Sequence, residues 1–389
     1  MDKIVVLGGG FAGIEAVIKL KKLGYNVTLV SNRDFLFIYP ISIWIPTKEN
    51  KFEDAKLMLT DLQKVHKFDL IIDEVTGIEP NNNKVILKSG SLDYDYLFIA
   101  FGMHKVKNKG VENTLTICGS PEDTLKVRDE LEKLVLKGSG NIAVGFAGNP
   151  NDEASSTLRG GPGFEIMFNI ATYLKKKGIR ENFEINFFAP MAEPGKKMGP
   201  KAFNKIGEFY DRYNIKRYIG KKIKEFQPRK VIFEDDSELS SDLIIFIAGG
   251  SGNSVVINSG LAVNKAGFIK ISDGCQAEGY SNIYAIGDVA EITGTEWIAK
   301  QGHMAEMMAD VAVNNFQVSK TGIGELKSYK DHISIICLMD SGDGAAMVTR
   351  TTKGDSILVM PIIGHWLKKA WGFYYKYSKL NKFPRIPGL

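Results

Sequence analysis

Short runs of consecutive apolar residues alternate along the chain with longer stretches in which apolar positions recur at helical spacing. Residues 3–7, 96–100 and 141–144 are runs of the kind that form strands buried on both faces. Residues 11–23 follow the first run and carry apolar side chains at helical spacing. This alternation predicts an α/β protein built on parallel sheets.

The order of these elements occurs twice in the sequence. Residues 141–188 repeat the opening strand–helix–strand order, and residues 242–249 repeat the Asp, apolar strand and Ala-x-Gly unit of residues 95–102. Such a repeat predicts two similar nucleotide-binding lobes, the second inserted in the first. We expect a first lobe made of residues 1–115 and 241–320, a second lobe of residues 116–240, and a C-terminal region of residues 321–389.

A glycine-rich turn lies between the first strand and the first helix. Gly8-Gly9-Gly10-Phe11-Ala12-Gly13 has the GxGxxG spacing of a dinucleotide site in the strand–turn–helix context that the site needs. Gly8 permits the tight turn, Gly10 lets the backbone approach a pyrophosphate, and Gly13 lets the helix pack closely on the strand. We therefore predict nucleotide binding here, in preference to an ordinary glycine turn.

The segment after the next strand lacks the usual acidic residue. Most dinucleotide folds place Asp or Glu there to accept the ribose hydroxyls, but this chain has Ser31-Asn32-Arg33. Ser31 or Asn32 can hydrogen-bond a ribose, and Arg33 can lie against an adenine or neutralise a phosphate. The segment is compatible with nucleotide binding but disfavours an ordinary NAD enzyme.

The second lobe carries a damaged version of the glycine turn. After the strand at 141–144 the chain runs Gly145-Phe146-Ala147-Gly148-Asn149-Pro150 and then through polar residues to 157. A proline cannot donate a backbone hydrogen bond, and the polar stretch postpones the helix beyond Pro162. These changes disfavour a nicotinamide nucleotide, although a rearranged turn at Gly160-Gly161 can still bind an anion.

Composition and charge narrow the class of protein. The chain has 389 residues, 44% hydrophobic, and a net charge of +5 that is spread along it, so we expect no nucleic-acid partner. Its three cysteines, Cys118, Cys275 and Cys337, are too few for a disulfide scaffold, and without a CxxC or Cys/His cluster we expect no metal. The absence of a signal peptide and of an 18-residue apolar run predicts residence on the cytoplasmic side.

The C-terminal residues 364–380 form a basic, aromatic, amphipathic helix pattern. Trp366, Phe373 and Tyr374 fall on one face, and Trp371 is nearby. The lysines beside this face are Lys368, Lys369, Lys376 and Lys379. Such a helix can lie in a bilayer interface, its rings among acyl chains and its lysines near anionic headgroups. We expect peripheral membrane association or quinone contact here; the alternative is packing on the lobes or in a dimer interface. His365 is either a proton relay or an ordinary cap or surface residue.

Three motifs taken together resemble a known group of proteins. The glycine turn, the strand ending at Ala100 and Gly102, and Gly287-Asp288 after the strand at 282–286 are similar in order and separation to two-dinucleotide-binding-domain flavoproteins. The resemblance covers roughly the first 320 residues and implies two Rossmann-like domains, with Asp288 serving the ribityl and pyrophosphate region of FAD. Phe101 departs from that group, which has Thr in this position.

The resemblance implies FAD as cofactor and a set of residues that bind it. These are Gly8, Gly10, Phe11, Ala12, Gly13, Ser31, Asn32, Arg33, Val75, Ala100, Gly102, Gly287, Asp288 and Lys300.

Within that group the chain looks most like sulfide:quinone oxidoreductases and flavocytochrome c sulfide dehydrogenases, with type II NADH dehydrogenases as relatives. The stretches at 31–40, 116–118, 299–306 and 334–337 carry this likeness. In those enzymes two cysteines flank the flavin, but Arg159 stands where the middle one belongs. Cys118 can replace it as the partner of Cys337 only if the fold brings the two sulfurs within disulfide reach.

Four residues are candidates for the chemistry. Cys337 near Arg159 or Lys300 would have a depressed pKa and act as a thiolate. Cys118 is either a buried thiol or, as the resemblance implies for some relatives, a covalent flavin tether. Lys300 either stabilises negative charge on reduced flavin or is a surface lysine, and Glu165 is either a helix-dipole partner or a proton relay.

The function expected from this resemblance is transfer of two electrons from sulfide or another small sulfur compound through FAD to a membrane quinone. One alternative is a type II NADH:quinone oxidoreductase-like enzyme. Another is a flavin electron-transfer protein without catalysis of its own. The sequence leaves open whether the protein is a homo-oligomer.

Overall fold

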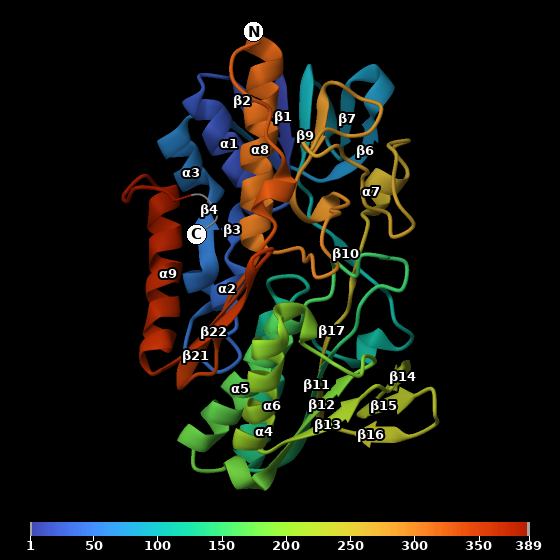
Figure 1. Ribbon diagram of the computed structural model, residues 1–389, viewed down its shortest axis with the longest axis vertical. Helices are drawn as coiled ribbons and strands as arrows, with labels where there is room; N and C mark the ends of the chain where they lie inside the picture. Colours follow the sequence, from blue (N-terminus) through green and yellow to red (C-terminus); the bar gives the residue numbers. More distant parts are fainter. Residues whose placement is uncertain (1, 387–389) are drawn as a thin grey trace.

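The computed structural model describes residues 2–386. Its first lobe is a five-stranded parallel sheet in the order β19-β9-β1-β2-β5 (Figure 1). The central strand β1 (Ile4–Leu7) is fully buried and pairs with β2 (Val27–Ser31) and β9 (Tyr96–Ile99). The edge strands are β5 (Asp69–Ile72) and β19 (Ile283–Ala285). Because β19 joins this sheet after residues 140–247 have formed another, the second lobe is an insertion, as predicted.

The second lobe is a four-stranded parallel sheet in the order β13-β12-β11-β17. β11 (Gly140–Phe146) lies between β12 (Phe183–Ala189) and β17 (Leu243–Ile247), as β1 lies between β2 and β9. The edge strand is β13 (Ile215–Ile219). The lobe boundary predicted at 240 is wrong by one strand, because β17 pairs with β11 rather than joining the first sheet.

Helices and small sheets complete the lobes. The helices are α1 (Phe11–Lys22), α2 (Tyr39–Ser42), α3 (Leu59–His66), α4 (Asp123–Lys137), α5 (Gly160–Lys176), α6 (Pro200–Arg212), α7 (Ser254–Ile257), α8 (Gly302–Thr321) and α9 (Ile363–Lys379). Strands of the small sheets in the lobes are β3 (Phe35–Phe37), β4 (Lys56–Met58), β6 (Val75–Glu79), β7 (Lys84–Leu87), β8 (Gly90–Asp93), β14 (Ile223–Gln227), β15 (Lys230–Phe233) and β16 (Glu238–Ser240).

Two chain crossings join the lobes. The chain leaves the first lobe through β10 (His104–Lys105) and returns through β18 (Gly250–Ser251), and these two strands pair antiparallel. After β19, Gly287–Val289 form a single 3-10 turn, and the long helix α8 begins only at Gly302.

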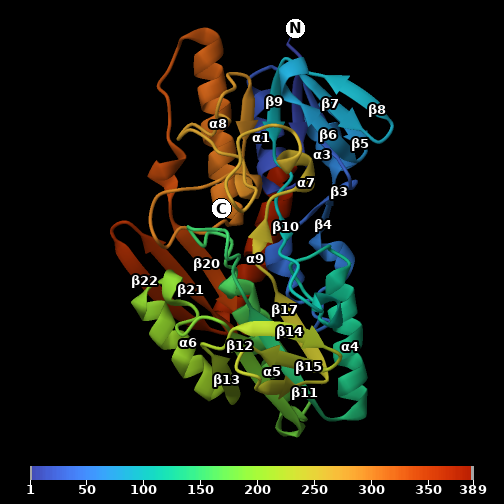
Figure 2. The ribbon, with the colours of Figure 1, turned by 90° about the vertical axis from the view of Figure 1, so that its right-hand side faces the viewer.

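The C-terminal region is an antiparallel sheet followed by a helix. β20 (Ile335–Asp340), β21 (Gly344–Thr351) and β22 (Gly354–Pro361) form a meander, and α9 packs against all three strands. Figure 1 shows α9 running along one side of the first lobe, and Figure 2 shows the meander beside α6 of the second lobe. The helix predicted at 364–380 is therefore confirmed, and it spans the junction of the lobes.

Candidate active site

A cavity of about 1240 Å³ lies where the two lobes and the C-terminal sheet meet. The glycine turn after β1, the 3-10 turn at Asp288, the start of α5 and the strand β20 all contribute to its wall. Of the FAD-binding residues predicted from the sequence, all except Gly13 line this cavity. Residues that are 280 positions apart in the sequence, such as Gly8 and Asp288, are thus brought to one site.

The three fingerprint glycines have different roles in the turn. Gly8 has φ +112°, and a Cβ there would lie 2.4 Å from the Ala100 carbonyl oxygen. A Cβ on Gly13 would lie 1.9 Å from the Gly8 oxygen, so Gly13 lets α1 approach the turn and does not form the cavity wall. A Cβ on Gly10 would meet no protein atom within 4 Å, because it would point into open space at the cavity. This is the cradle that an approaching pyrophosphate requires.

The segment after β2 forms the far end of the cavity. The Ser31 hydroxyl donates to the Arg33 carbonyl at 2.7 Å and accepts from the Arg33 N–H at 3.2 Å, so it stabilises the local turn. Asn32 is exposed at the cavity, and Val75 lies opposite on β6. Asn32 and Arg33, rather than Ser31, therefore have side chains available to a bound nucleotide.

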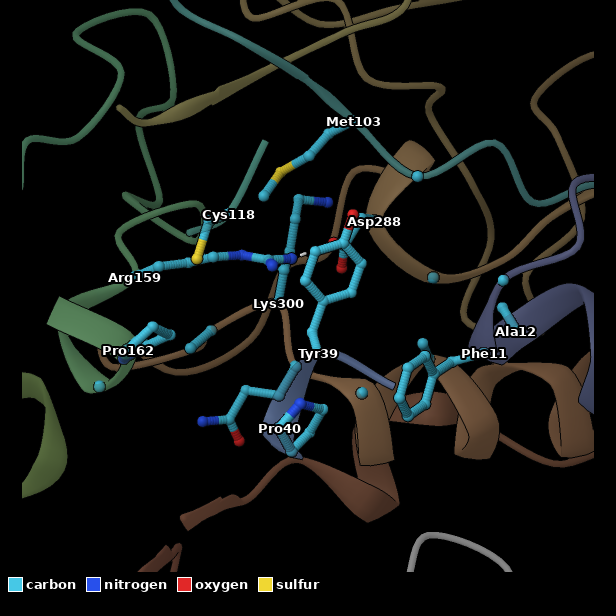
Figure 3. A pocket seen from close by; sticks show the side chains of 18 of the residues that line it. Phe11, Ala12, Tyr39, Pro40, Met103, Cys118, Arg159, Pro162, Asp288 and Lys300 are labelled. Carbon is cyan, nitrogen blue, oxygen red and sulfur yellow. Dashed lines mark hydrogen bonds and ion pairs between the residues drawn. The ribbon is translucent and has the colours of Figure 1, made fainter. Parts of the chain in front are cut away.

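Arg159, the residue in place of the family's middle cysteine, forms an ion pair with Asp288 across the lobe junction (Figure 3). Arg159 is the N-cap residue of α5, and its Nε is buried without a hydrogen-bond partner. Burial disfavours the guanidinium charge, but Asp288 and the nearby Cys118 and Tyr39 outweigh it and raise the pKa of Arg159. The second lobe thus places a positive charge beside Asp288.

Two lysines add to this positive wall. Burial lowers the pKa of Lys105 to about 8, and Arg159 acts in the same direction. Lys300 is buried; its ammonium donates to the Ala290 carbonyl and lies 4.2 Å from the centroid of the Phe268 ring. Burial lowers the pKa of Lys300 to about 8 although Asp288 opposes the change. The surface-lysine alternative for Lys300 is therefore wrong. The positively charged side chains on this wall attract an anion into the cavity.

Cys337 lines the cavity beside the start of α5. A Cβ on Gly161 would lie 3.5 Å from its Sγ. Burial raises the pKa of Cys337 to about 12, with Glu165 adding to the rise and Lys368 opposing it. The expected depressed pKa is wrong, because burial disfavours the thiolate and the charges that act on it are Glu165 and Lys368 rather than Arg159 or Lys300.

Cys118 lies on the basic side of the cavity, next to Arg159 (Figure 3). Burial raises the pKa of its thiol, while Lys105 and Arg159 oppose the rise. Cys118, Cys275 and Cys337 are all free thiols, and Cys275 is fully buried away from the cavity. The two cavity thiols are therefore protonated at neutral pH.

Glu165 is buried at the cavity wall and pairs with Lys368 of α9. One of its oxygens also accepts the backbone N–H of Asp340 at 2.8 Å. Burial raises the pKa of Glu165, and Lys368 and the Asp340 N–H oppose the rise. Because it is held by side chains of other elements, Glu165 is not simply a partner of its own helix dipole.

The segment between β11 and α5 is tied down by its own polar side chains. The Asn149 side chain donates to the Gly250 carbonyl at 2.8 Å and accepts from the Asn151 N–H at 2.9 Å. The Asp152 carboxylate accepts from the Thr157 N–H at 2.9 Å. Residues 147–159 separate the end of β11 from the start of α5. The helix begins at Gly160, so the expectation that it starts beyond Pro162 is wrong by a few residues.

The residues of the C-terminal helix that were expected at the membrane or quinone have different environments. Trp371 lines the cavity, whereas Trp366 and Phe373 are 63% and 56% exposed. The Tyr374 hydroxyl donates to the Pro384 carbonyl at 2.9 Å and accepts from the Ile386 N–H. Lys368 and Lys379 are buried in ion pairs, so the expectation that they lie beside an exposed aromatic face is wrong.

Two nucleotide-binding lobes around a glycine-lined cavity define a dinucleotide-dependent oxidoreductase. The chain belongs to the pyridine nucleotide-disulphide oxidoreductase family, whose model matches residues 2–314. Ferroptosis suppressor protein 1 of Mus musculus is 25% identical over 362 residues, which cover 89% of this chain and 88% of the relative. The type II NADH:quinone oxidoreductase of Staphylococcus aureus is 25% identical over 371 residues, 89% of each chain.

Solved structures show the same fold. The sulfide:quinone oxidoreductase from Aquifex aeolicus has a TM-score of 0.88 at 24% identity, covering 98% of this chain and 92% of the other. NDH2 from Plasmodium falciparum in complex with NADH has a TM-score of 0.74 at 16% identity, covering 100% and 99%. The resemblance expected from the sequence is confirmed, and the protein is a flavin-dependent oxidoreductase that uses FAD.

The residues present fit FAD. The open space in front of Gly10, the free helix N-terminus of α1 and the Asp288 carboxylate match the needs of a pyrophosphate and a ribityl chain.

Sequence reasoning missed several charged residues that shape the site. Lys105, Lys368, Asp340 and Glu49 lie close to the cavity or beneath it, but each resembles an ordinary surface residue in the sequence. Their ion-pair and hydrogen-bond partners are more than 170 positions away in several cases, so no local pattern could indicate them.

Proposed function

We propose that the protein transfers two electrons from sulfide or another small sulfur anion through FAD to a membrane quinone. One observation carries the proposal: the cavity that holds the FAD-binding turns also opens on an exposed apolar surface. Ile336 and Leu367 belong both to the cavity wall and to that surface. An apolar quinone can thus reach the site from a bilayer without crossing water.

The apolar face, as we name this surface, consists of exposed side chains of β20, β22 and α9. They are Ile336, Leu358, Ile362, Ile363, Trp366, Leu367 and Phe373. Soluble proteins rarely expose so many large apolar side chains together, and such a patch is typical of a membrane or protein contact. No helix within residues 2–386 is long and apolar enough to cross a membrane. We propose that this face lies on a bilayer as a peripheral contact.

The donor side is the basic wall. Arg159, Lys105 and the N-terminus of α5 attract an anion to the side of the cavity where Cys118 lies. Since both cavity thiols are protonated at neutral pH, an incoming hydrosulfide or similar anion carries the negative charge there. FAD, when bound, accepts the electron pair from the donor and passes it on. Glu165 and Lys368, beside Cys337, are placed to hold and donate a proton at a quinone oxygen.

NADH is the second candidate donor. Relatives of this chain include enzymes named as type II NADH:quinone oxidoreductases, and the match covers 89% of this chain. The tied-down segment at 147–159 and the late start of α5 favour a small donor instead.

An anaerobic titration of the FAD-loaded protein tests the proposal. Sulfide and NADH are added in separate experiments, flavin absorbance is followed, and a soluble quinone analogue is then supplied. We expect sulfide to bleach the flavin, NADH to act much more slowly, and the quinone to restore the colour. Rapid bleaching by NADH with none by sulfide would replace the sulfur donor by the second candidate.

Matched cysteine variants refine this test. Cys337→Ala and Cys118→Ala remove the two cavity thiols, and Cys275→Ala is the control, since Cys275 is buried outside the cavity. We expect sulfide bleaching to slow at least about tenfold in one of the cavity variants and to persist in the control. Equal bleaching in all three would show that no thiol takes part.

A further inference from the structure

Hydrogen-bonded side chains lead from the protein surface through His365 to Asp340, and the backbone N–H of Asp340 donates to Glu165 at the cavity wall. His365 of α9 stands in the middle of this chain of hydrogen bonds. Its Nδ1 lies 2.8 Å from Asp340 Oδ2, and its Nε2 lies 2.6 Å from Glu49 Oε1. The imidazole therefore bridges a carboxylate in the interior and a carboxylate near solvent.

The inner end of the chain is fully enclosed. The Asp340 side chain is completely buried and accepts from Trp44 Nε1 at 3.0 Å and from the Gly342 N–H at 2.8 Å. The backbone N–H of Asp340 donates to Glu165, so the two acidic residues are fixed next to one another. Lys368, the partner of Glu165, also lowers the pKa of Asp340 by its charge. Lys368 thus faces both carboxylates and the cavity.

The outer end reaches solvent. The Glu49 side chain is 24% exposed and also pairs with Lys369 at 2.6 Å. Burial opposes ionisation of Glu49, but the hydrogen bonds from His365 and Lys369 prevail and lower its pKa to about 2. Hydrogen bonds to Asp340 and Glu49 raise the pKa of His365 to about 9 against the effect of burial. At neutral pH the imidazole carries a proton on each nitrogen, one toward each carboxylate.

We propose that His365 is a relay residue that brings solvent protons to the Glu165–Lys368 pair during quinone reduction. The inference rests on the proposed function, because reduction of a quinone to its hydroquinone takes up two electrons and two protons. Those protons must enter an enclosed site. The hydrogen bonds from Glu49 through His365 to Asp340, together with Lys368, whose charge acts on Asp340 and which pairs with Glu165, supply such an entry.

The relay moves one proton at a time and no electrons. When Lys368 has given a proton to a quinone oxygen, the Nδ1–H of His365 passes a proton to the Asp340 carboxylate. The amine of Lys368 turns from Glu165 to Asp340 and takes up that proton, which leaves Asp340 a carboxylate again. A half-turn of the neutral ring then brings its bare nitrogen to the solvent side beside Glu49, where it takes up a new proton. Each cycle therefore breaks and forms only N–H and O–H bonds.

Proton delivery to the quinone can be tested without knowing the natural electron donor, by measuring reoxidation of the reduced flavin. The FAD-loaded protein is reduced with dithionite and mixed anaerobically with a soluble quinone analogue across neutral and alkaline pH. We expect the reoxidation rate of the unmodified protein to fall above a pH of about 9, where His365 loses its proton. His365→Ala should slow reoxidation at neutral pH at least about tenfold, and added imidazole should restore part of the rate.

A matched control is His66→Gln. His66 is also buried beneath α9, where its Nε2 lies 2.7 Å from the Lys379 carbonyl oxygen, but it is outside the chain of hydrogen bonds from Glu49 to Asp340. We expect this variant to keep the rate and the alkaline fall of the unmodified protein. Glu49→Gln, a change near the surface, should move the alkaline fall to lower pH because one carboxylate that raises the pKa of His365 is gone.

A second measurement is independent of turnover. NMR titration of ring-labelled histidines should show one resonance, absent from His365→Ala, that titrates near pH 9 and shifts downward in Glu49→Gln. Failure of the unmodified reduced protein to react with any quinone would overturn quinone reduction itself. Quinone reactivity that is unchanged by His365→Ala would overturn the relay, as would a slow variant that imidazole cannot rescue and whose alkaline fall is unchanged.

Discussion

Two glycines of the same turn should respond differently to the same substitution. Gly13→Ala places a Cβ 1.9 Å from the Gly8 oxygen, so we expect the unfolding free energy to fall by about 1–3 kcal/mol. Gly10→Ala meets no protein atom and leaves Gly10 at an extended φ of −89°, so the folded chain should lose less than about 1 kcal/mol.

Gly10→Ala should have little effect on stability but a large effect on FAD binding. Its Cβ would project into the space that a pyrophosphate must approach, so we expect FAD to bind roughly tenfold or more weakly. Denaturant unfolding of the FAD-free protein and flavin titration measure the two quantities separately. A Gly10→Ala protein that retains FAD at the original affinity would place the pyrophosphate elsewhere.

At this scale the sequence predicts backbone roles better than side-chain charge states. Gly8, Gly10 and Gly13 behave as their spacing indicates, because a turn is a local structure. The pKa of Cys337 was predicted in the wrong direction, since it depends on the burial of the sulfur and on the charged neighbour that adds to the effect of burial. That neighbour, Glu165, could not be deduced because the contact depends on how β20 packs against α5.

The helix α9 is fixed by buried charge. The Lys379 ammonium lies 2.6 Å from both Glu15 Oε2 of α1 and Glu306 Oε1 of α8, and all three side chains are almost fully buried. Lys379→Met leaves two buried carboxylates that have lost a shared cation. We expect the unfolding free energy to fall by about 3–5 kcal/mol.

The matched control for this prediction is Lys376→Met, one turn earlier on the same helix and only partly buried. Its unfolding free energy should change by less than about 0.5 kcal/mol. Equal stability of the two variants in denaturant would show that the Lys379 cluster does not hold α9 in place.

The amphipathic pattern correctly predicts the helix but not its orientation. Periodicity gives the faces of a helix, and long lysines on the boundary are compatible with either solvent or an ion pair. Ion pairs with Glu15, Glu165 and Glu306 determine which lysines are buried. These glutamates lie on helices far away in the sequence.

The whole molecule combines a repeated architecture that the sequence predicts with a lobe junction that it does not. The insertion of the second lobe follows from the two matching strand orders. The junction instead depends on contacts between the lobes, such as the pair of Arg159 with Asp288, and on the position of the C-terminal sheet. The cavity and the apolar face both arise there, so the proposed meeting of quinone and flavin is a property of the assembled chain.

Binding to vesicles tests this arrangement. The double variant Trp366→Glu and Phe373→Glu adds two negative charges to the apolar face and removes two aromatic rings, so we expect its binding to anionic lipid vesicles to weaken at least about tenfold. The control carries the same charges at Leu136 and Ile323, which are 80% and 77% exposed and lie on other elements. That control should sediment with vesicles like the unmodified protein, since neither residue belongs to the apolar face. Equal sedimentation of both double variants would mean that the apolar face does not contact the bilayer and that quinone enters by another route.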